Sequence, residues 1–204
     1  DVVGRPDLQI LAGTDVLSSG SVNEDTTICP NSSITLTATG ANSYEWEGPN
    51  LDLDNVDEVT ASPQTTTIYT VRGFAGGCEE VRDVVVRVED PIDVSINSIA
   101  DVCRGETTSI SANISGGRPP YTISWTGDNI VSGQGTPVIQ ATQTAGEQDY
   151  SITVTDDLGC SVTRTATAFS NPLPNALTAV NGFITSSIDI CRDTEVSVEA
   201  IGAT

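Results

Sequence analysis

The stretch Tyr150-Ser151-Ile152-Thr153-Val154-Thr155-Asp156-Asp157-Leu158-Gly159-Cys160 decides the fold class of this chain. From Tyr150 to Thr155, apolar residues alternate with Ser and Thr, as in a strand with one face toward a core and one toward water. Asp156-Asp157-Leu158-Gly159 has the composition of a tight turn. The stretch therefore predicts a strand, a turn and a second strand that opens at Cys160.

The stretch belongs to an internal repeat, which sets the domain organisation. Repeat 1 contains Ile28-Cys29-Pro30, Tyr44-Glu45-Trp46, Ile68-Tyr69-Thr70-Val71 and Gly77-Cys78. Repeat 2 contains Val102-Cys103-Arg104, Tyr121-Thr122-Ile123-Ser124-Trp125, Tyr150-Ser151-Ile152-Thr153-Val154 and Gly159-Cys160. A third copy opens with Ile190-Cys191-Arg192-Asp193. Short alternating runs separated by Gly, Pro, Asn and Asp predict an all-β protein of tandem immunoglobulin-like or PKD-like antiparallel β-sandwich domains.

The repeat boundaries predict three segments. Residues 1–90 are expected to form the first sandwich, with residues 1–24 as a leading strand or linker. Residues 91–172 are expected to form the second sandwich, and residues 173–204 to begin a truncated third repeat. Because the chain has no Met and ends partway through the third copy, we expect it to be a slice of a longer protein.

Four aromatic residues recur at matched places in the two repeats. They are Trp46 and Tyr69 in repeat 1 and Trp125 and Tyr150 in repeat 2. A small sandwich commonly buries a Trp of this kind in its centre. We therefore predict that all four are core anchors rather than ligand-binding aromatics.

The five cysteines predict disulfides in an oxidising compartment, since they recur once per landmark and form no Cys-x-x-Cys pair. The preferred pairing joins Cys29 to Cys78 and Cys103 to Cys160, and leaves Cys191 for a partner beyond Thr204. The competing pairing joins Cys78 to Cys103 and Cys160 to Cys191. The first pairing has a topological difficulty, because the two landmarks lie at opposite ends of a seven-strand sandwich.

The composition excludes several function classes. The chain has 28 acidic residues and 8 basic residues, and its net charge is -20. Every basic residue is an Arg. Without His it has no Ser-His-Asp or Cys-His nucleophile and no His-ligated zinc. So acidic a surface repels nucleic acid and anionic membranes. The chain contains no run of 18 apolar residues, so we expect no direct membrane insertion. No carboxylate pair with neighbouring aromatic residues stands out, so we do not expect an enzyme.

Carboxylates at two predicted junctions are candidate Ca²⁺ ligands. Glu89 and Asp90 precede the second repeat, and Asp156 and Asp157 lie in a turn. Asp156-Asp157-Leu158-Gly159 also has the composition of an ordinary turn, which is the favoured interpretation of the second pair. A further cluster, Asp52-Leu53-Asp54 with Asp57-Glu58, lacks the central Gly and the terminal Glu of a calcium loop, and is interpreted as a solvated acidic loop. No other cofactor is expected.

The same residues carry a family resemblance. Cys103-Arg104-Gly105, the run from Gly116-Gly117-Arg118-Pro119-Pro120 to Trp125, and the run from Tyr150 to Cys160 resemble the repeats of SprB-type adhesins. Ser62-Pro63-Gln64-Thr65-Thr66-Thr67-Ile68-Tyr69-Thr70-Val71 is similar to PKD-like and immunoglobulin-like modules of the same secreted Bacteroidota proteins. The resemblance covers about residues 20–204. It implies an extracellular, cell-surface protein associated with type IX secretion and gliding motility. Asp25-Thr26-Thr27 resembles an O-glycan acceptor of such proteins, at Thr26.

Two function classes follow. The first is a structural or adhesive repeat segment of a large secreted surface protein, a stalk or filament. Its partners would be neighbouring repeats of the same long chain, surface glycans or other surface proteins. The alternative is a carbohydrate- or protein-binding accessory module of a secreted multidomain enzyme.

Overall fold

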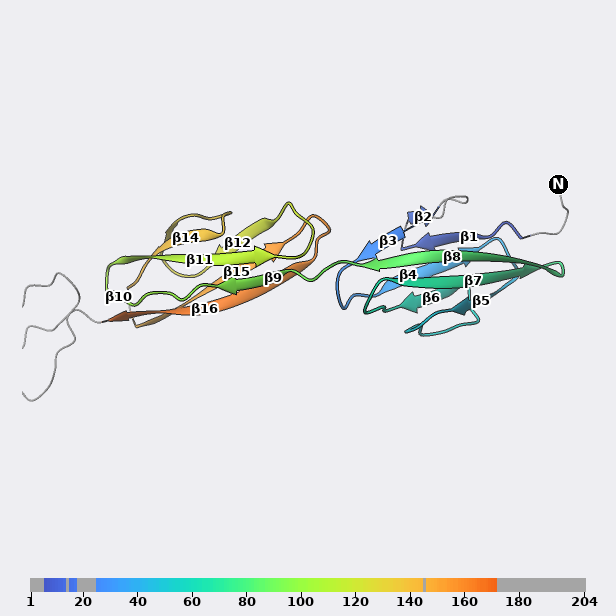
Figure 1. Ribbon diagram of the computed structural model, residues 1–204, viewed down its shortest axis with the longest axis horizontal. Helices are drawn as coiled ribbons and strands as arrows, with labels where there is room; N and C mark the ends of the chain where they lie inside the picture. The colour runs from blue at the N-terminus through green and yellow to red at the C-terminus, as the bar shows by residue number, and fades with distance from the viewer. Residues whose placement is uncertain (1–5, 14, 18–24, 145, 172–204) are drawn as a thin grey trace, which may run out of the picture. The chain divides into compact units, whose positions relative to one another are not determined.

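The computed structural model describes residues 6–13, 15–17, 25–144 and 146–171, and every element within these ranges is a β-strand (Figure 1). The chain divides into two units. Unit 1 takes in the described part of Asp1–Ile92 together with the turns Gly116–Pro120 and Asp156–Cys160, and unit 2 takes in the rest. Two turns of repeat 2 thus belong to unit 1, a grouping that the repeat boundaries do not predict. The third repeat and Cys191 lie outside the described residues.

Repeat 1 forms two four-stranded sheets. One sheet has the order β2 (Asp15–Leu17), β1 (Gln9–Ala12), β4 (Ile34–Thr39) and β6 (Glu58–Ala61). The other has the order β3 (Asp25–Ile28), β8 (Cys78–Val88), β7 (Thr67–Ala75) and β5 (Ser43–Glu47). All neighbours are antiparallel except β3 and β8, which run parallel.

Repeat 2 repeats this plan. One sheet has the order β13 (Ile130–Ser132), β14 (Val138–Thr142), β11 (Thr107–Ser115) and β9 (Asp93–Ile96). The other has the order β10 (Val102–Cys103), β16 (Ser161–Asn171), β15 (Glu147–Thr155) and β12 (Thr122–Thr126). The short β10 again runs parallel to the last strand. The predicted immunoglobulin-like β-sandwich class is therefore confirmed for both repeats.

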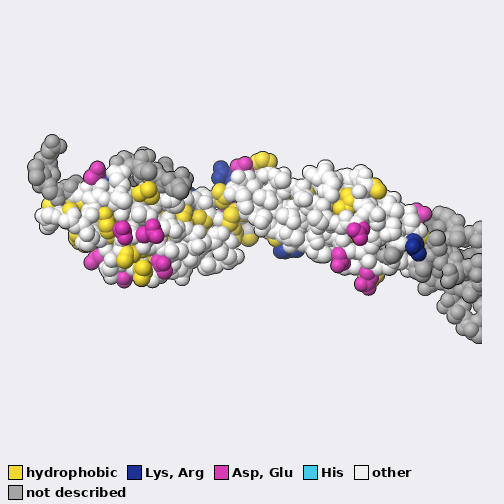
Figure 2. Space-filling model, turned by 180° about the vertical axis from the view of Figure 1, so that it is seen from behind, with side chains coloured by type: hydrophobic (Ala, Val, Ile, Leu, Met, Phe, Trp, Pro, Cys, Tyr) yellow, Lys and Arg dark blue, Asp and Glu magenta, His cyan; other side chains and the backbone are white. Residues whose placement is uncertain are grey.

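Acidic side chains are spread over the visible face, with Arg at only a few places (Figure 2). The strand pattern explains this distribution, because alternate residues of each strand face water. In β15, Tyr150, Ile152 and Val154 are buried, as their alternation predicts. Most of the described charged side chains therefore face water, and Glu80 and Asp156 are buried exceptions.

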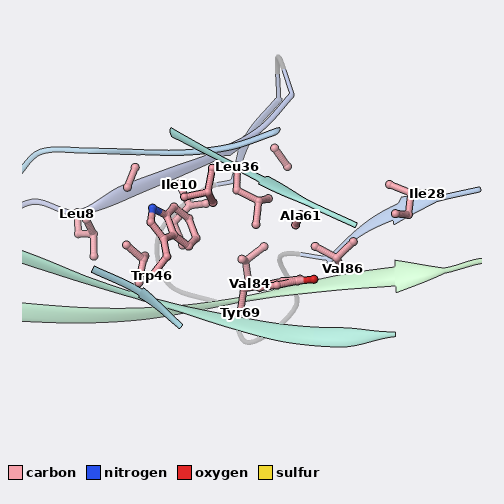
Figure 3. Close-up of a cluster of buried hydrophobic side chains, with 13 residues drawn as sticks. Leu8, Ile10, Ile28, Leu36, Trp46, Ala61, Tyr69, Val84 and Val86 are labelled. Atoms are coloured by element: carbon pink, nitrogen blue, oxygen red, sulfur yellow. The ribbon is translucent and has the colours of Figure 1, made fainter. Parts of the chain in front are cut away.

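The core of unit 1 is closed by residues from both sheets (Figure 3). Leu36 and Ala61 come from one sheet, and Tyr69, Val84 and Val86 from the other. Ile10 and Ala12 of β1 are also buried in this core. The expected leading segment thus supplies a strand of the first sandwich. At about 25 cal/mol per Å² of apolar surface, these side chains stabilise a modest core.

Candidate functional site

All four predicted anchor aromatics are buried, and each polar end has a partner. The indole N–H of Trp46 donates to the Val56 carbonyl at 3.1 Å, and that of Trp125 to the Thr136 carbonyl at 3.0 Å. The hydroxyl of Tyr69 donates to the Pro49 carbonyl, and that of Tyr150 to the Asp128 carbonyl, each at 3.0 Å. Each anchor aromatic is therefore held in its core by packing and by a hydrogen bond to a backbone carbonyl.

Burial raises the pKa of both anchor tyrosines above the ordinary value near 10. For Tyr150, a hydrogen bond from Gln143 opposes this effect, and the nearby charge of Asp128 adds to it. The neutral phenol is therefore the form that the folded chain favours.

A matched glycine completes each anchor pair, and sequence reasoning missed both glycines. Gly48 and Gly127 each lie two residues after an anchor Trp. A Cβ at Gly48 would collide with the ring of Tyr69, and one at Gly127 with the ring of Tyr150. The shared Trp-x-Gly spacing was the signal that could have revealed them.

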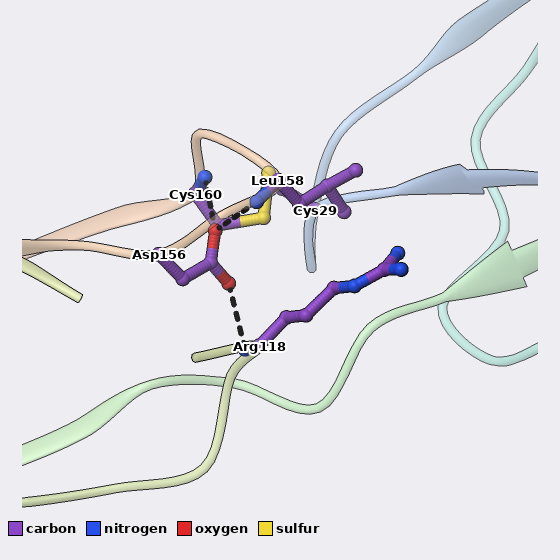
Figure 4. Close-up of a disulfide and its surroundings, with 5 residues drawn as sticks. All are labelled: Cys29, Arg118, Asp156, Leu158 and Cys160. Atoms are coloured by element: carbon purple, nitrogen blue, oxygen red, sulfur yellow. Dashed lines mark hydrogen bonds between the residues drawn. A yellow bond between two sulfur atoms is a disulfide. The ribbon is translucent and has the colours of Figure 1, made fainter. Parts of the chain in front are cut away.

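The disulfide pairing differs from the preferred prediction. Cys29 is bonded to Cys160, with a Cα–Cα distance of 5.4 Å and a sequence separation of 131 residues (Figure 4). Cys103 is also disulfide-bonded, and Cys78 is a free thiol of intermediate exposure. The predicted pairs Cys29–Cys78 and Cys103–Cys160 are therefore wrong. The competing pairs are wrong as well, because Cys78 is free and Cys160 is bonded to Cys29.

Strand length explains why the preferred pairs fail. Ile28, next to Cys29, pairs with Val88 at one end of β8, whereas Cys78 begins that strand. Ten residues of strand span about 33 Å, and a disulfide tolerates only about 4–7 Å between Cα atoms. In repeat 2, Cys103 pairs with Asn171 at the end of β16, and Cys160 precedes the start of that strand. The same separation applies there.

Asp156 organises the turn that presents Cys160. Its side chain is buried, and its Oδ1 accepts hydrogen bonds from the backbone N–H of Leu158 at 3.0 Å and of Cys160 at 2.9 Å. Its Oδ2 accepts the backbone N–H of Arg118 at 3.1 Å (Figure 4). A buried carboxylate needs such partners. Asp156 therefore fixes both Gly116–Pro120 and the turn of Cys160.

The linker residues contact the same turns. The N–H of Glu89 donates to the Ile28 carbonyl at 3.0 Å, and the N–H of Gly117 donates to the Asp90 carbonyl at 3.2 Å. Gly117 has φ +61, and a Cβ there would meet the Ile92 side chain. The disulfide, the linker and the two turns thus form one connected site, which we call the staple site.

The four candidate calcium ligands have different surroundings. The carboxylate oxygens of Asp156 accept hydrogen bonds from backbone N–H groups. Asp157 forms an exposed ion pair with the Arg118 guanidinium at 4.0 Å. Glu89 is half-buried and Asp90 exposed. Among the described residues, no three His, Cys, Asp or Glu side chains come together as a metal-ligand set. Calcium binding remains a prediction.

Two other sequence candidates lie in unit 1. In the acidic loop, Asp52 accepts the backbone N–H of Thr60 at 2.7 Å, and this hydrogen bond lowers the pKa of its carboxyl. Thr26 lies within β3, half-buried and opposite Val86. Glycosylation at Thr26 remains a prediction. Within the described ranges, no helix has the length and apolar character to cross a membrane.

Comparison with known proteins gives a likeness of fold only. No protein-family profile and no curated protein sequence matches the chain. Among solved structures, the N-terminal eight immunoglobulin domains of Down syndrome cell adhesion molecule match 72% of this chain at 15% identity and a TM-score of 0.47. The titin I-band fragment I67–I69 matches 72% at 14% identity and a TM-score of 0.40. A C-terminal intimin fragment, solved in complex with its receptor's intimin-binding domain, matches 70% at 16% identity and a TM-score of 0.44.

The chain spans 23% of the adhesion molecule structure, 63% of the titin structure and 60% of the intimin structure. The immunoglobulin-like assignment of both repeats rests on the strand order and register given above.

Proposed function

We propose that this chain is a tension-bearing structural repeat segment of a secreted adhesin. The observation that carries the proposal is the Cys29–Cys160 disulfide, which closes 131 residues of sequence into one covalent loop. A force applied at the two ends of the chain passes from Cys29 through the sulfur atoms to Cys160. Strands β4 to β15 lie inside the loop and do not extend under that force.

The disulfide also favours an oxidising, extracellular setting, because cytosolic thiols are kept reduced. Assignment to a Bacteroidota surface protein, with type IX secretion and a part in gliding motility, is proposed from the sequence resemblance alone. The net charge of -20 supports a solvated filament whose copies repel one another. We propose no catalytic role for the chain.

Surface exposure and shear resistance test the proposal. Protease treatment of intact producing cells is expected to release peptides of this chain with Cys29 and Cys160 still bonded. Cells that carry Cys29→Ser and Cys160→Ser together are expected to detach at lower shear than cells that carry the unmodified chain. Recovery of the chain only from the cytoplasm, in reduced form, would contradict the proposal. Equal detachment of the two strains would also contradict it.

A further inference from the structure

We propose that Cys78 is a disulfide attachment site for the opening cysteine of another repeat of this kind, as Cys160 is for Cys29. The inference deepens the proposed function, and it rests on that function only in treating the chain as one member of a repeat array. It starts from the free Cys78 thiol and from the bonded state of its counterpart in repeat 2.

The strand register shows that Cys78 and Cys160 are equivalent. The anchor Tyr69 pairs with Val84, and Cys78 lies six residues before Val84. The anchor Tyr150 pairs with Ala166, and Cys160 lies six residues before Ala166. Both cysteines therefore follow the turn of the hairpin that precedes the last strand. We call this position the closing cysteine.

Cys29 and Cys103 are equivalent by the same measure. Ile28 pairs with Val88, four residues after Val84, and Val102 pairs with Ser170, four residues after Ala166. Cys29 follows Ile28, Cys103 follows Val102, and each of these two cysteines begins a turn of the same kind. We call this position the opening cysteine.

The two opening turns share their geometry. The Cys29 carbonyl accepts the N–H of Ser32 at 3.1 Å, with Asn31 at φ 61. The Cys103 carbonyl accepts the N–H of Glu106 at 3.0 Å, with Gly105 at φ 92. A β-turn with a left-handed third residue thus presents the opening sulfur in both repeats.

The observed bond joins the opening cysteine of repeat 1 to the closing cysteine of the repeat that follows it. Cys29, the opening cysteine of repeat 1, cannot reach Cys78 in the same repeat, because β8 separates the two by about 33 Å. The remaining closing cysteine, Cys78, therefore fits the opening turn of a different repeat. Gly76 and Gly77, at φ 59 and 80, form a tight turn beside it, and the space around Gly77 is open.

The chemistry is thiol–disulfide exchange. The Cys78 thiolate attacks an opening cysteine held in a mixed disulfide, the new S–S bond forms, and the original thiol leaves as a thiolate with the electron pair of the broken bond. Starting from two free thiols, the same bond requires a low-molecular-weight disulfide as oxidant, which is reduced to two thiols. The exchange form needs no other reactant.

Exchange between two full-length chains tests the proposal. The donor is the Cys78→Ser/Cys160→Ser chain, with its Cys29 converted to a mixed disulfide with the chromophoric thiol thionitrobenzoate and verified by peptide mapping. The acceptor is the unmodified chain, which keeps its Cys29–Cys160 bond. Release of the coloured thiolate reports the rate, and non-reducing peptide mapping identifies the new bond.

The matched control acceptor is Cys78→Ser/Ser132→Cys, which carries its free thiol on the exposed strand β13. We expect Cys78 to react at least about tenfold faster than the β13 thiol of this control, a difference of about 1.4 kcal/mol in activation free energy, and to yield the Cys29–Cys78 peptide. A smaller ratio, or a product mapped to another cysteine, would overturn the inference. That result would leave the proposed function untouched, because the Cys29–Cys160 bond and its shear test do not involve Cys78.

Discussion

Cys29 and Cys160 are bonded to each other across 131 residues, although each has a potential partner within its own repeat. The β-sandwich causes this arrangement, because the last strand of each repeat separates its opening cysteine from its closing cysteine. The disulfide therefore links one repeat to the next instead of closing a single repeat. The staple site and the predictions below depend on that relationship.

Removing the disulfide should destabilise the fold through the unfolded state. In the chain-entropy relation, a loop of this length restricts the unfolded chain by about 5 kcal/mol at 25 °C. We expect the Cys29→Ser/Cys160→Ser chain to unfold at a lower urea concentration than the wild type. Cys78→Ser, which removes a free thiol, should leave the urea midpoint unchanged. Equal midpoints for all three chains would contradict the disulfide's stabilising role.

Replacing Asp156 should weaken the staple site. Asp156→Ala leaves the N–H groups of Arg118, Leu158 and Cys160 without their acceptor, at a cost of about 1–3 kcal/mol for a buried donor that stays unpaired. Asp157→Ala, at an exposed neighbour, is the matched control and should cost less than about 1 kcal/mol. Thermal unfolding measures both. A control as destabilised as Asp156→Ala would show that the buried hydrogen bonds are not the cause.

Stability should fall at alkaline pH because of the anchor tyrosines. Burial raises the pKa of Tyr69 and Tyr150 in the folded chain, so the folded chain holds these protons more tightly than the unfolded chain. The stabilisation is complete below the unfolded pKa near 10 and is lost as the pH rises toward the folded pKa. The melting temperature of a Cys78→Ser chain, which avoids thiol exchange, should fall from pH 9 to 11. Tyr69→Phe should make that fall shallower, and an unchanged slope would contradict the assignment.

Gly48→Ala should disturb the core of unit 1. The added methyl group meets the Tyr69 ring, and overpacking of this kind costs about 1–3 kcal/mol. Gly48→Ala/Tyr69→Leu removes the ring that collides. The double-mutant cycle should therefore show a favourable coupling between the two substitutions. Strictly additive losses of unfolding free energy would indicate that the glycine is needed for another reason.

The sequence predicted the fold class because its signals are local. Alternation in runs such as Tyr150–Thr155 depends only on the two-residue period of a strand, and the buried side chains follow it. The four anchor aromatics could also be predicted, because each type of anchor occurs at the same place in both repeats. Gly48 and Gly127 carried a comparable signal in the Trp-x-Gly spacing, but it was overlooked.

The staple site could not be predicted in the same way. Which cysteines meet depends on where β8 and β16 end, and therefore on strand lengths and register that alternation does not determine. The role of Asp156 was equally hidden, because a turn Asp that accepts N–H bonds from two segments looks like any other turn Asp. The topological difficulty noted for Cys29 and Cys78 was the one clue available.

Single-molecule extension of the chain, held at its two ends, tests the central claim most directly. Both samples carry Cys78→Ser and Cys103→Ser, and the second also carries Cys29→Ser and Cys160→Ser. We predict that complete unfolding of the first chain releases about 450 Å less contour length than unfolding of the second, at about 3.3–3.6 Å for each of the 131 residues in the closed loop. Equal contour lengths for the two chains would contradict the claim that a Cys29–Cys160 bond carries the force past the intervening strands.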